Sequence, residues 1–308
     1  MLNLLAIHWN VDPVIFHIGS FGLRWYSLGF LFAFLLGYVT LNKMFKREKV
    51  DPQYLDSLFV YMFVAVLIGA RLGHCLFYEP SFYLTKEHWF EILLPIGQRY
   101  VVQDGQYLIE NGQLVTHWAF TGYQGLASHG AAIAILFTLW LFYRIKRMNP
   151  WWVVDRLVIV VALGGAFIRL GNLFNSEIYG VATDLPWGFI FERNHETVAK
   201  HPTQLYEAIS YLIIFGISLL AYQRKADKLR SGRLFGWWLI ALFGMRFIIE
   251  FVKETQVDFE KGMALDMGQW LSLPFILGGI ILVILSYTNK LPQGPFIPSK
   301  NQKLTSEN

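Results

Sequence analysis

The stretch "WWVVDRLVIVVALGGAFIRLGNLFNSEIYG", residues 151–180, joins a long apolar run to a cluster of polar side chains. A helix needs about 20 mostly apolar residues to cross the hydrocarbon core of a bilayer, and residues 152–173 provide that length. Arg169, Asn172 and Glu177 lie at or just beyond its far end, where a charged side chain is costly and by default indicates a functional site. The stretch therefore predicts a membrane helix that ends in a polar site.

The composition of the whole chain is that of a membrane protein. Of its 308 residues, 55% are hydrophobic and 16% are charged, whereas a soluble domain carries nearer a quarter charged residues. We predict an all-α polytopic membrane protein with about seven transmembrane helices. The expected spans lie at residues 25–44, 55–77, 126–143, 152–173, 203–222, 234–252 and 268–287.

Lys and Arg residues are distributed unevenly between the two sides of these spans. Counting Lys43 with the first connection, the connections after spans one, three and five and the C-terminal tail hold 15, against 6 in the others. Because cytoplasmic loops carry the excess of Lys and Arg, we predict an extracytoplasmic N-terminus and a cytoplasmic C-terminus (N-out, C-in). These basic residues form short clusters between spans, so the net charge of +4 indicates no nucleic-acid partner.

The segments outside the spans on the outer side are expected to form a small mixed α/β extracytoplasmic head. Its parts are residues 8–24, 78–125 and 174–202. Two β-rich runs flank Asn111-Gly112, a dipeptide typical of hairpin turns, and "PVIFHIGSFGLRWYS" near the N-terminus favours a second hairpin. We predict one membrane-embedded domain over residues 1–290, a disordered cytoplasmic tail over residues 291–308, and no removable signal peptide.

Arg71, Arg169 and Arg246 belong to three different spans, and each lies toward the predicted outer end of its span. Three guanidinium groups at one depth favour a shared anionic ligand over three side chains that reach the interface separately. A guanidinium group matches phosphate geometry and stays charged when desolvated, so we expect a lipid-phosphate site. Glu250 follows Arg246 by four residues, and this spacing equally allows the two to neutralise each other.

Other polar residues lie at or near span ends. His129 begins the third span and is a candidate base, although a single histidine is more often structural. Tyr26 begins the first span and could equally be an aromatic residue of the membrane interface. Glu207 is expected to face the bundle or the arginines, because a carboxylate exposed to lipid is costly. The single cysteine, Cys75, excludes an internal disulfide and argues against a cysteine-ligated metal.

Seven motifs together resemble the bacterial prolipoprotein diacylglyceryl transferase family. In chain order they are "DPVIFHIGSFGLRWYSLGF", "GARLGHCLFY", "SHG", "IRLGNLFNSEIYG", "HPTQLYE", "MRFIIEF" and "MGQWLSLPFIL". The fourth is similar to the family signature GR-x-GN-F-NxE-x-G, which it matches at Arg169, Gly171, Asn172, Asn175, Glu177 and Gly180. Ile168 replaces the first Gly of that signature, the family's HGG reads His129-Gly130-Ala131, and the segment 88–125 is longer than usual.

The resemblance implies a transferase of the bacterial cytoplasmic (inner) membrane with its active site on the extracytoplasmic side. It would transfer the sn-1,2-diacylglyceryl group of phosphatidylglycerol to the lipobox cysteine of a preprolipoprotein, forming a thioether and releasing glycerol phosphate in the first step of lipoprotein maturation. This chemistry needs no metal and no cofactor, because the peptide supplies the nucleophile. The residues by themselves also allow a non-enzymatic protein that binds or transports an anionic lipid.

The resemblance also suggests roles for individual residues. The expected catalytic residues are His129, Arg169, Arg246 and Tyr26. The expected phosphatidylglycerol-binding residues are Arg169, Asn172, Glu177, Gly180, Arg246, Glu250 and Arg71. Arg169 would bind the phosphate, Arg246 would be a second clamp oriented by Glu250, and His129 would take the thiol proton, with Tyr26 or water as the alternatives.

Overall fold

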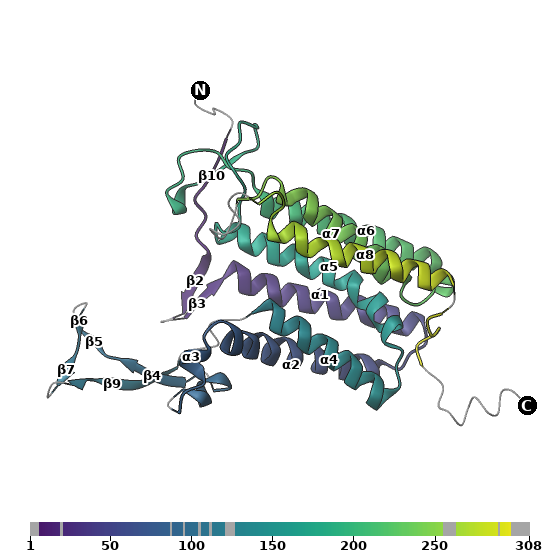
Figure 1. The fold of residues 1–308 in the computed structure, drawn as a ribbon, viewed down its shortest axis with the longest axis horizontal. Coiled ribbons are helices and arrows are strands. Elements are labelled where there is room, and N and C mark those ends of the chain that lie inside the picture. Colours follow the sequence, from purple (N-terminus) through teal and green to yellow (C-terminus); the bar gives the residue numbers. More distant parts are fainter. Residues whose placement is uncertain are drawn as a thin grey trace, which may run out of the picture. The chain divides into compact units, whose positions relative to one another are not determined.

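The computed structural model describes residues 6–18, 21–86, 88–94, 96–103, 106–110, 113–120, 127–254, 263–288 and 290–296. The chain divides into two compact units. The first contains residues 1–52 and 148–308, and the second contains residues 53–147. Figure 1 shows the order of the elements along the chain, which is mostly helical.

The first unit is built around α5 (Pro150–Phe174), which packs against α1, α6 and α7, while α7 also packs against α8 (Figure 1). The surrounding helices are α1 (Trp25–Arg47), α6 (Thr203–Lys225), α7 (Arg233–Glu250) and α8 (Met267–Tyr287). Helix α5 begins where the sequence favours it, because Pro150 suits the first turn and the Asn149 side chain accepts the N–H of Trp151 at 3.1 Å. Its central position brings the polar residues of its last turn among neighbouring helices.

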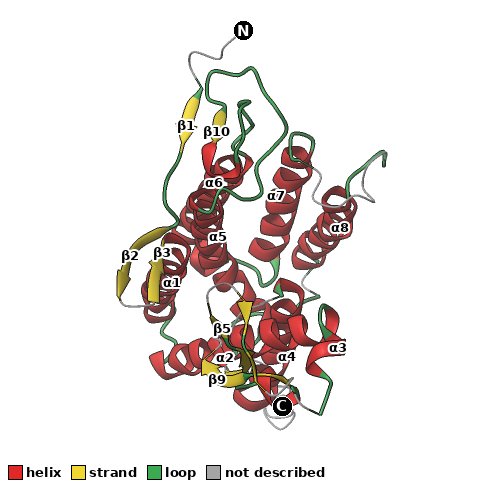
Figure 2. Ribbon diagram, turned by 90° about the vertical axis from the view of Figure 1, so that its left-hand side faces the viewer, coloured by secondary structure: helices red, strands yellow, loops and turns green. Residues whose placement is uncertain are grey.

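Two pairs of short strands lie at one end of this bundle (Figures 1 and 2). Strands β2 (Val14–Ile18) and β3 (Phe21–Arg24) pair antiparallel, which confirms the predicted N-terminal hairpin, whose turn at residues 19–20 lies outside the described residues. Strand β1 (Ile7–Trp9) pairs in parallel with β10 (Phe189–Phe191). The Trp9 indole donates to the carbonyl of Leu173 at 2.9 Å, so this pair attaches loop 174–202 to the end of α5.

The second unit contains two long helices, α2 (Pro52–Phe77, beginning one residue before the unit boundary) and α4 (Ser128–Lys146). They approach closely at Gly69 and Gly73 of α2 and Gly130 of α4, where a Cβ on Gly73 would lie 2.7 Å from the Cα of Gly130. Small residues spaced four apart let membrane helices pack backbone to backbone. Gly130 therefore allows the backbones of α2 and α4 to approach closely.

The segment that joins α2 to α4 along the chain contains two short helical turns and three antiparallel strand pairs. They are α3 (Pro80–Tyr83), a 3-10 turn η1 (Trp89–Ile92), and the antiparallel pairs β4 (Ile96–Tyr100) with β9 (Thr116–Phe120), β5 (Val102–Gln103) with β6 (Gln106–Tyr107), and β7 (Ile109–Glu110) with β8 (Gln113–Leu114). Strands β7 and β8 flank Asn111-Gly112 as predicted, although these two turn residues lie outside the described residues.

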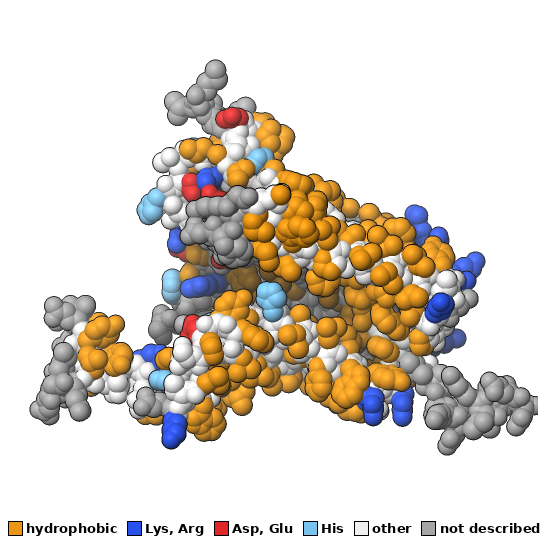
Figure 3. Space-filling view, viewed as in Figure 1, with side chains coloured by type: hydrophobic (Ala, Val, Ile, Leu, Met, Phe, Trp, Pro, Cys, Tyr) orange, Lys and Arg blue, Asp and Glu red, His pale blue; other side chains and the backbone are white. Residues whose placement is uncertain are grey.

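Among the described residues, five helices, α1, α2, α5, α6 and α8, are long and apolar enough to cross a membrane, which makes this a polytopic membrane protein. Helix α7 is not among the five, and its 18 residues include Arg233, Arg246 and Glu250. Helix α4 is also outside the set, so the count of seven spans stays a prediction. Large apolar side chains cover the helices in the space-filling view (Figure 3), as expected of surfaces that face lipid.

The beginning of the predicted tail contacts the start of α5. The backbone N–H of Asn149 donates to the carbonyl of Pro295 at 2.8 Å, and its side chain donates to the carbonyl of Pro292 at 2.7 Å. Met148 and Phe296 form an isolated antiparallel bridge. Residues 291–296 are therefore attached to the bundle, and residues 297–308 lie outside the described residues.

Candidate functional site

The candidate site of the first unit is built where α5 ends. After Phe174 the chain turns sharply, and Ser176 and Ile178 have left-handed backbone angles, with φ of 55° and 63°. Positive φ is uncommon outside glycine, and such residues gather at functional sites. The turn folds Glu177 back over the last turn of α5, where its N–H donates to the carbonyl of Asn172 at 3.1 Å.

Hydrogen bonds connect the side chains of this turn to Arg169. Nη1 of Arg169 donates to Oδ1 of Asn172 at 3.2 Å, which confirms that the two residues share one helical face. Nδ2 of Asn172 donates to Oε1 of Glu177 at 2.8 Å, and Nδ2 of Asn175 donates to the same oxygen at 3.1 Å. The carboxylate of Glu177 thus fixes the orientation of both amides, and through Asn172 it helps to hold the guanidinium group.

A fully buried carboxylate on α6 faces the same arginine. Glu207 has 0% exposure, and its Oε2 lies 2.8 Å from Nε of Arg169. Its Oε1 lies 4.0 Å from Nζ of Lys253, which is also buried. Neither carboxylate oxygen has a hydrogen bond of good geometry within the described residues, so charge attraction dominates these contacts. The expectation that Glu207 faces the arginine cluster is confirmed for Arg169.

Lys253, which follows α7, extends this chain of charges to Glu250. Its Nζ lies 3.4 Å from Oε2 of Glu250, and the carboxylate of Glu250 packs against Gly268, where a Cβ would overlap it. Among the described residues the ion-pair partner of Glu250 is Lys253, and Arg246 is not paired with it. Lys253 was not predicted as a site residue, because in the sequence it is one more basic residue in a connection between spans.

Among the described residues of this region, Arg246 on α7 is a cation without an ion-pair partner. It is half-buried, its Nε is buried without a hydrogen-bond partner, and it forms no ion pair within the part of the chain that the structure describes. A half-buried cation without a counter-ion is suited to a negatively charged ligand.

Two glycines hold the site together by close backbone approach. The N–H of Gly180 donates to the carbonyl of His201 at 2.8 Å, and a Cβ at Gly180 would overlap the carbonyl oxygen of Val252. Gly171 packs beneath the ring of Tyr26, which would be displaced by any side chain there. Gly180 therefore joins the loop to the segment after α7, and Gly171 brings Tyr26 to the last turn of α5.

The start of α6 fixes the loop from the other side. Nε2 of Gln204 donates to the carbonyl of Glu177 at 2.7 Å, and Oγ1 of Thr203 donates to the carbonyl of Ile178 at 2.8 Å. Both side chains have 0% exposure. The Thr203 and Gln204 side chains of "HPTQLYE" therefore donate hydrogen bonds to backbone carbonyls of the strained turn. The sequence alone did not indicate this role.

An ion network outside the membrane helices ties the loop to the segment after α7. Nζ of Lys200 lies 3.1 Å from Glu254 and 3.6 Å from Glu196, and Tyr179 donates to Glu196 at 2.9 Å. Burial alone would lower the pKa of Lys200. The hydrogen bond and negative charge of Glu254 raise this pKa by more than burial lowers it, so the pKa is raised overall. Burial lowers the pKa of His201, which keeps that imidazole neutral near pH 7.

Arg71 and His129 belong to the second unit. Arg71 is buried, with Nη2 donating to the carbonyl of Glu91 at 2.7 Å, Nε donating to the carbonyl of Ile92 at 3.2 Å, and its guanidinium group 4.7 Å from the Tyr83 ring. His129 is exposed in the first turn of α4. The predicted convergence of Arg71 with Arg169 and Arg246 involves both units and stays a prediction, as does the predicted role of His129 as the base.

The second unit also contains a buried carboxylate that the sequence did not single out. Glu91 is 1% exposed, lies 2.7 Å from Nδ1 of His88, and accepts a hydrogen bond from Arg99 at 3.2 Å. These contacts join η1 to β4 and account for its burial. Within the described ranges, no group of three or more His, Cys, Asp or Glu side chains is arranged as metal ligands.

The apolar helices, with charged side chains buried where α5 ends, define a polytopic membrane protein that holds a polar site at the end of a membrane helix. Residues 13–285 match the family model described as prolipoprotein diacylglyceryl transferase. The chain belongs to the prolipoprotein diacylglyceryl transferase family, which confirms the resemblance seen in its motifs.

Curated relatives cover nearly the whole chain. The phosphatidylglycerol–prolipoprotein diacylglyceryl transferase of Bacteroides fragilis is 43% identical over 277 residues, which are 90% of this chain and 94% of the relative. The enzyme of the same name from Tolumonas auensis is 41% identical over 92% of this chain and 99% of its own length. That of Porphyromonas gingivalis is 39% identical over 93% of this chain and 97% of its own length.

Proposed function

We propose that this protein transfers the diacylglyceryl group of phosphatidylglycerol to the cysteine thiol of a prolipoprotein. The observation that carries the proposal is the match to enzymes of that name over nine-tenths of the chain. The site supports it, because the family's arginine lies in a buried charged network at the end of a membrane helix. A non-enzymatic lipid carrier is the alternative, and it differs by leaving phosphatidylglycerol intact.

The reaction generates charge where the site offers a cation. A base removes the thiol proton, the sulfur bonds to the glycerol carbon that carries the phosphate, and the carbon–oxygen bond breaks with its electron pair going to the phosphate oxygen. Thiolate is the reactive form of cysteine. The phosphodiester becomes a phosphomonoester, which gains a second negative charge. A preorganised cation aimed at that oxygen is the expected main source of rate.

We assign the two arginines different tasks on this basis. Arg169 is already neutralised by Glu207 and oriented by Asn172, so its remaining N–H donors would bind the phosphate with little change in net charge. Arg246 lacks an anionic partner among the described residues, so it would stabilise the charge that appears on the leaving group. Glu250 would act on the site through its ion pair with Lys253. Glu177 and Gly180 would maintain the geometry of the pocket through the hydrogen bond to Asn172 and the close contact with Val252.

The base stays open between His129, Tyr26 and water. Replacing His129 with Gln and Tyr26 with Phe in separate variants distinguishes them, because each change removes the proton-accepting group and keeps the size. Activity lost only in His129→Gln assigns the base to His129, and activity lost only in Tyr26→Phe assigns it to Tyr26. Full turnover in both variants leaves water as the base and contradicts both assignments.

We also propose the membrane arrangement that the sequence favours. It has seven spans in one membrane-embedded domain over residues 1–290, an extracytoplasmic N-terminus and head, and a cytoplasmic C-terminus. Seven long helices at the predicted places support the span count. In this orientation α5 presents Arg169 to the extracytoplasmic side of the bacterial inner membrane. Cysteine accessibility at residues 185 and 228, added one at a time to a Cys75→Ser chain, tests the two sides.

The function is tested with purified protein, phosphatidylglycerol and a lipobox peptide. Mass spectrometry should detect the peptide with a thioether-linked diacylglyceryl group, together with released glycerol phosphate. Arg169→Ala should remove the product, and it should also destabilise the protein because the buried carboxylate of Glu207 loses its partner, so turnover is measured per amount of folded protein. Binding of phosphatidylglycerol without any product would favour the carrier. Retained turnover in Arg169→Ala would instead refute the role of that side chain.

A further inference from the structure

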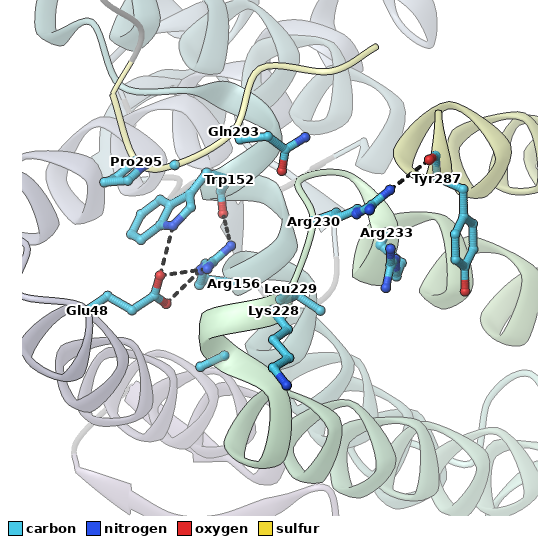
Figure 4. Close-up of a pocket in the computed structure, with 12 residues that line it drawn as sticks. Glu48, Trp152, Arg156, Lys228, Leu229, Arg230, Arg233, Tyr287, Gln293 and Pro295 are labelled. Carbon is cyan, nitrogen blue, oxygen red and sulfur yellow. Dashed lines mark hydrogen bonds and ion pairs between the residues drawn. The ribbon is translucent and has the colours of Figure 1, made fainter. Parts of the chain in front are cut away.

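The first unit contains a cavity of about 710 Å³ that lies away from the candidate site (Figure 4). Glu48, Trp152 and Arg156 lie on one side of it, and Arg230, Arg233 and Tyr287 lie on the other. The short turn η3 (Ala226–Lys228) and the segment around Gln293 complete the lining. Its volume is that of a pocket for a small organic ligand, and it exceeds the size of a single inorganic ion.

The cavity lies at the end of α5 opposite to Arg169. Arg156, which lines it, precedes Arg169 by thirteen residues, or about 20 Å of helix. The lining includes the last residue of α8 and the first of α7, and Glu48 directly follows α1. A cavity among the ends of membrane helices lies at the depth of lipid headgroups.

Among the described side chains of the lining, the carboxylate is that of Glu48, and it is already paired. Glu48 accepts hydrogen bonds from Arg156 at both oxygens, at 2.9 and 2.7 Å, and further bonds from Trp152 at 2.9 Å and Tyr222 at 2.8 Å. The guanidinium group of Arg156 also lies 4.3 Å from the Trp152 ring. Arg156 therefore neutralises Glu48, and neither charge remains for a ligand.

Three other cations line the cavity without a carboxylate partner among the described residues. Lys228 is exposed and forms no ion pair there. Arg230 donates to the carbonyl of Tyr287 at 2.7 Å, and Arg233 lies 4.2 Å from the ring of that tyrosine. The Nε of Arg233 is buried without a hydrogen-bond partner. Within the described part of the chain, the lining thus holds three positive charges without a carboxylate partner and a buried donor without a hydrogen-bond partner.

We propose that this cavity binds the phosphate of an anionic phospholipid headgroup in the leaflet opposite to the candidate site. Guanidinium groups suit a phosphate because their paired N–H donors match its oxygens. Basic pockets between membrane helices on the cytoplasmic side are typical sites for anionic headgroups. A soluble phosphate ester would satisfy the same cations, but the depth of the cavity favours a ligand that is present in the membrane.

The test uses the full chain in detergent and phosphatidylserine, an anionic lipid other than the proposed substrate. Native mass spectrometry measures the fraction of protein that carries the lipid. The double variant Arg230→Gln/Arg233→Gln should bind about tenfold more weakly, because it removes two charge-assisted contacts. The matched control Arg224→Gln/Lys225→Gln removes the same charge from exposed residues at the end of α6 that do not line the cavity.

Each outcome decides the proposal. Weakened binding in the cavity variant alone supports it, and equal binding in wild type, cavity variant and control overturns it. Displacement of the lipid by inorganic phosphate or glycerol phosphate at equal concentration would show a soluble ligand and overturn the choice of a lipid. If the double variant does not fold, Lys228→Gln should still weaken binding about threefold, and unchanged affinity there overturns the proposal.

Discussion

Replacing Glu207 with Gln isolates the buried ion pair at the centre of the candidate site. The change keeps the shape of the side chain and removes one charge at 0% exposure. At 2.8 Å from Arg169 the Coulomb attraction is about 6 kcal/mol for an effective dielectric constant of 20, and at 4.0 Å from Lys253 it is about 4 kcal/mol. Desolvation offsets much of both, so we expect a net loss of about 3–5 kcal/mol in the free energy of unfolding.

A double-mutant cycle separates the pair from general damage. Unfolding of the purified protein is followed by circular dichroism during titration with a denaturing detergent, for wild type, Glu207→Gln, Arg169→Gln and the double variant. The double variant should be more stable than Glu207→Gln, because removing Arg169 as well leaves fewer buried charges without a partner. Glu254→Gln, which breaks the ion pair of the exposed Glu254 side chain with Lys200, is the control and should change stability by less than about 1 kcal/mol.

The cycle also gives the result that would refute this reasoning. A coupling energy between Glu207 and Arg169 below about 0.5 kcal/mol would mean that the two charges act independently. The 2.8 Å contact would then contribute nothing of its own to the folded state.

Two further substitutions test the other parts of the site. Arg246→Gln should lower the rate of diacylglyceryl transfer about 100-fold or more with little change in unfolding, because its charge has no ion-pair partner among the described residues and is proposed to stabilise the leaving group; a mass-spectrometric rate equal to wild type would contradict that role. Gly180→Ala should destabilise the protein by about 1–3 kcal/mol, since its Cβ would overlap the Val252 carbonyl oxygen. Gly216→Ala on α6, where a Cβ meets no atom within 4 Å, is its matched control, and equal stability of the two variants would disprove the packing argument.

Features that depend on local sequence were predictable. The helices of the structure begin and end within a few residues of the predicted spans, because apolar length and proline or basic residues at their ends are local signals. Helix α5 was expected at residues 152–173 and occupies Pro150–Phe174. The two hairpins follow in the same way from turn residues between β-rich runs. The parallel pair β1 and β10 joins segments about 180 residues apart, and no local pattern indicates such a partner.

Within the site, the sequence indicated which charged residues are unusual, but it did not show which of them form ion pairs with one another. Because a charge inside a membrane is costly, Arg169, Arg246 and Glu207 could be identified from the sequence as charged residues that need a structural or functional explanation. The spacing of Arg246 and Glu250 left their pairing undecided, and the structure pairs Glu250 with Lys253 instead. Lys253 could not be found from sequence, since a lysine in a connection is ordinarily solvated, and only the fold of the loop after α7 buries it.

Glu48 has a mechanical consequence for the bundle. This one side chain follows α1 and binds Arg156 and Trp152 of α5 and Tyr222 of α6, so three membrane helices share a single anchor at one end. At the other end of α5, the Arg169–Glu207 ion pair joins it to α6, and the close contact of Gly171 with Tyr26 joins it to α1. The same three helices are therefore held together by polar or close contacts at both ends, and these contacts fix the spacing of the apolar helix surfaces between them.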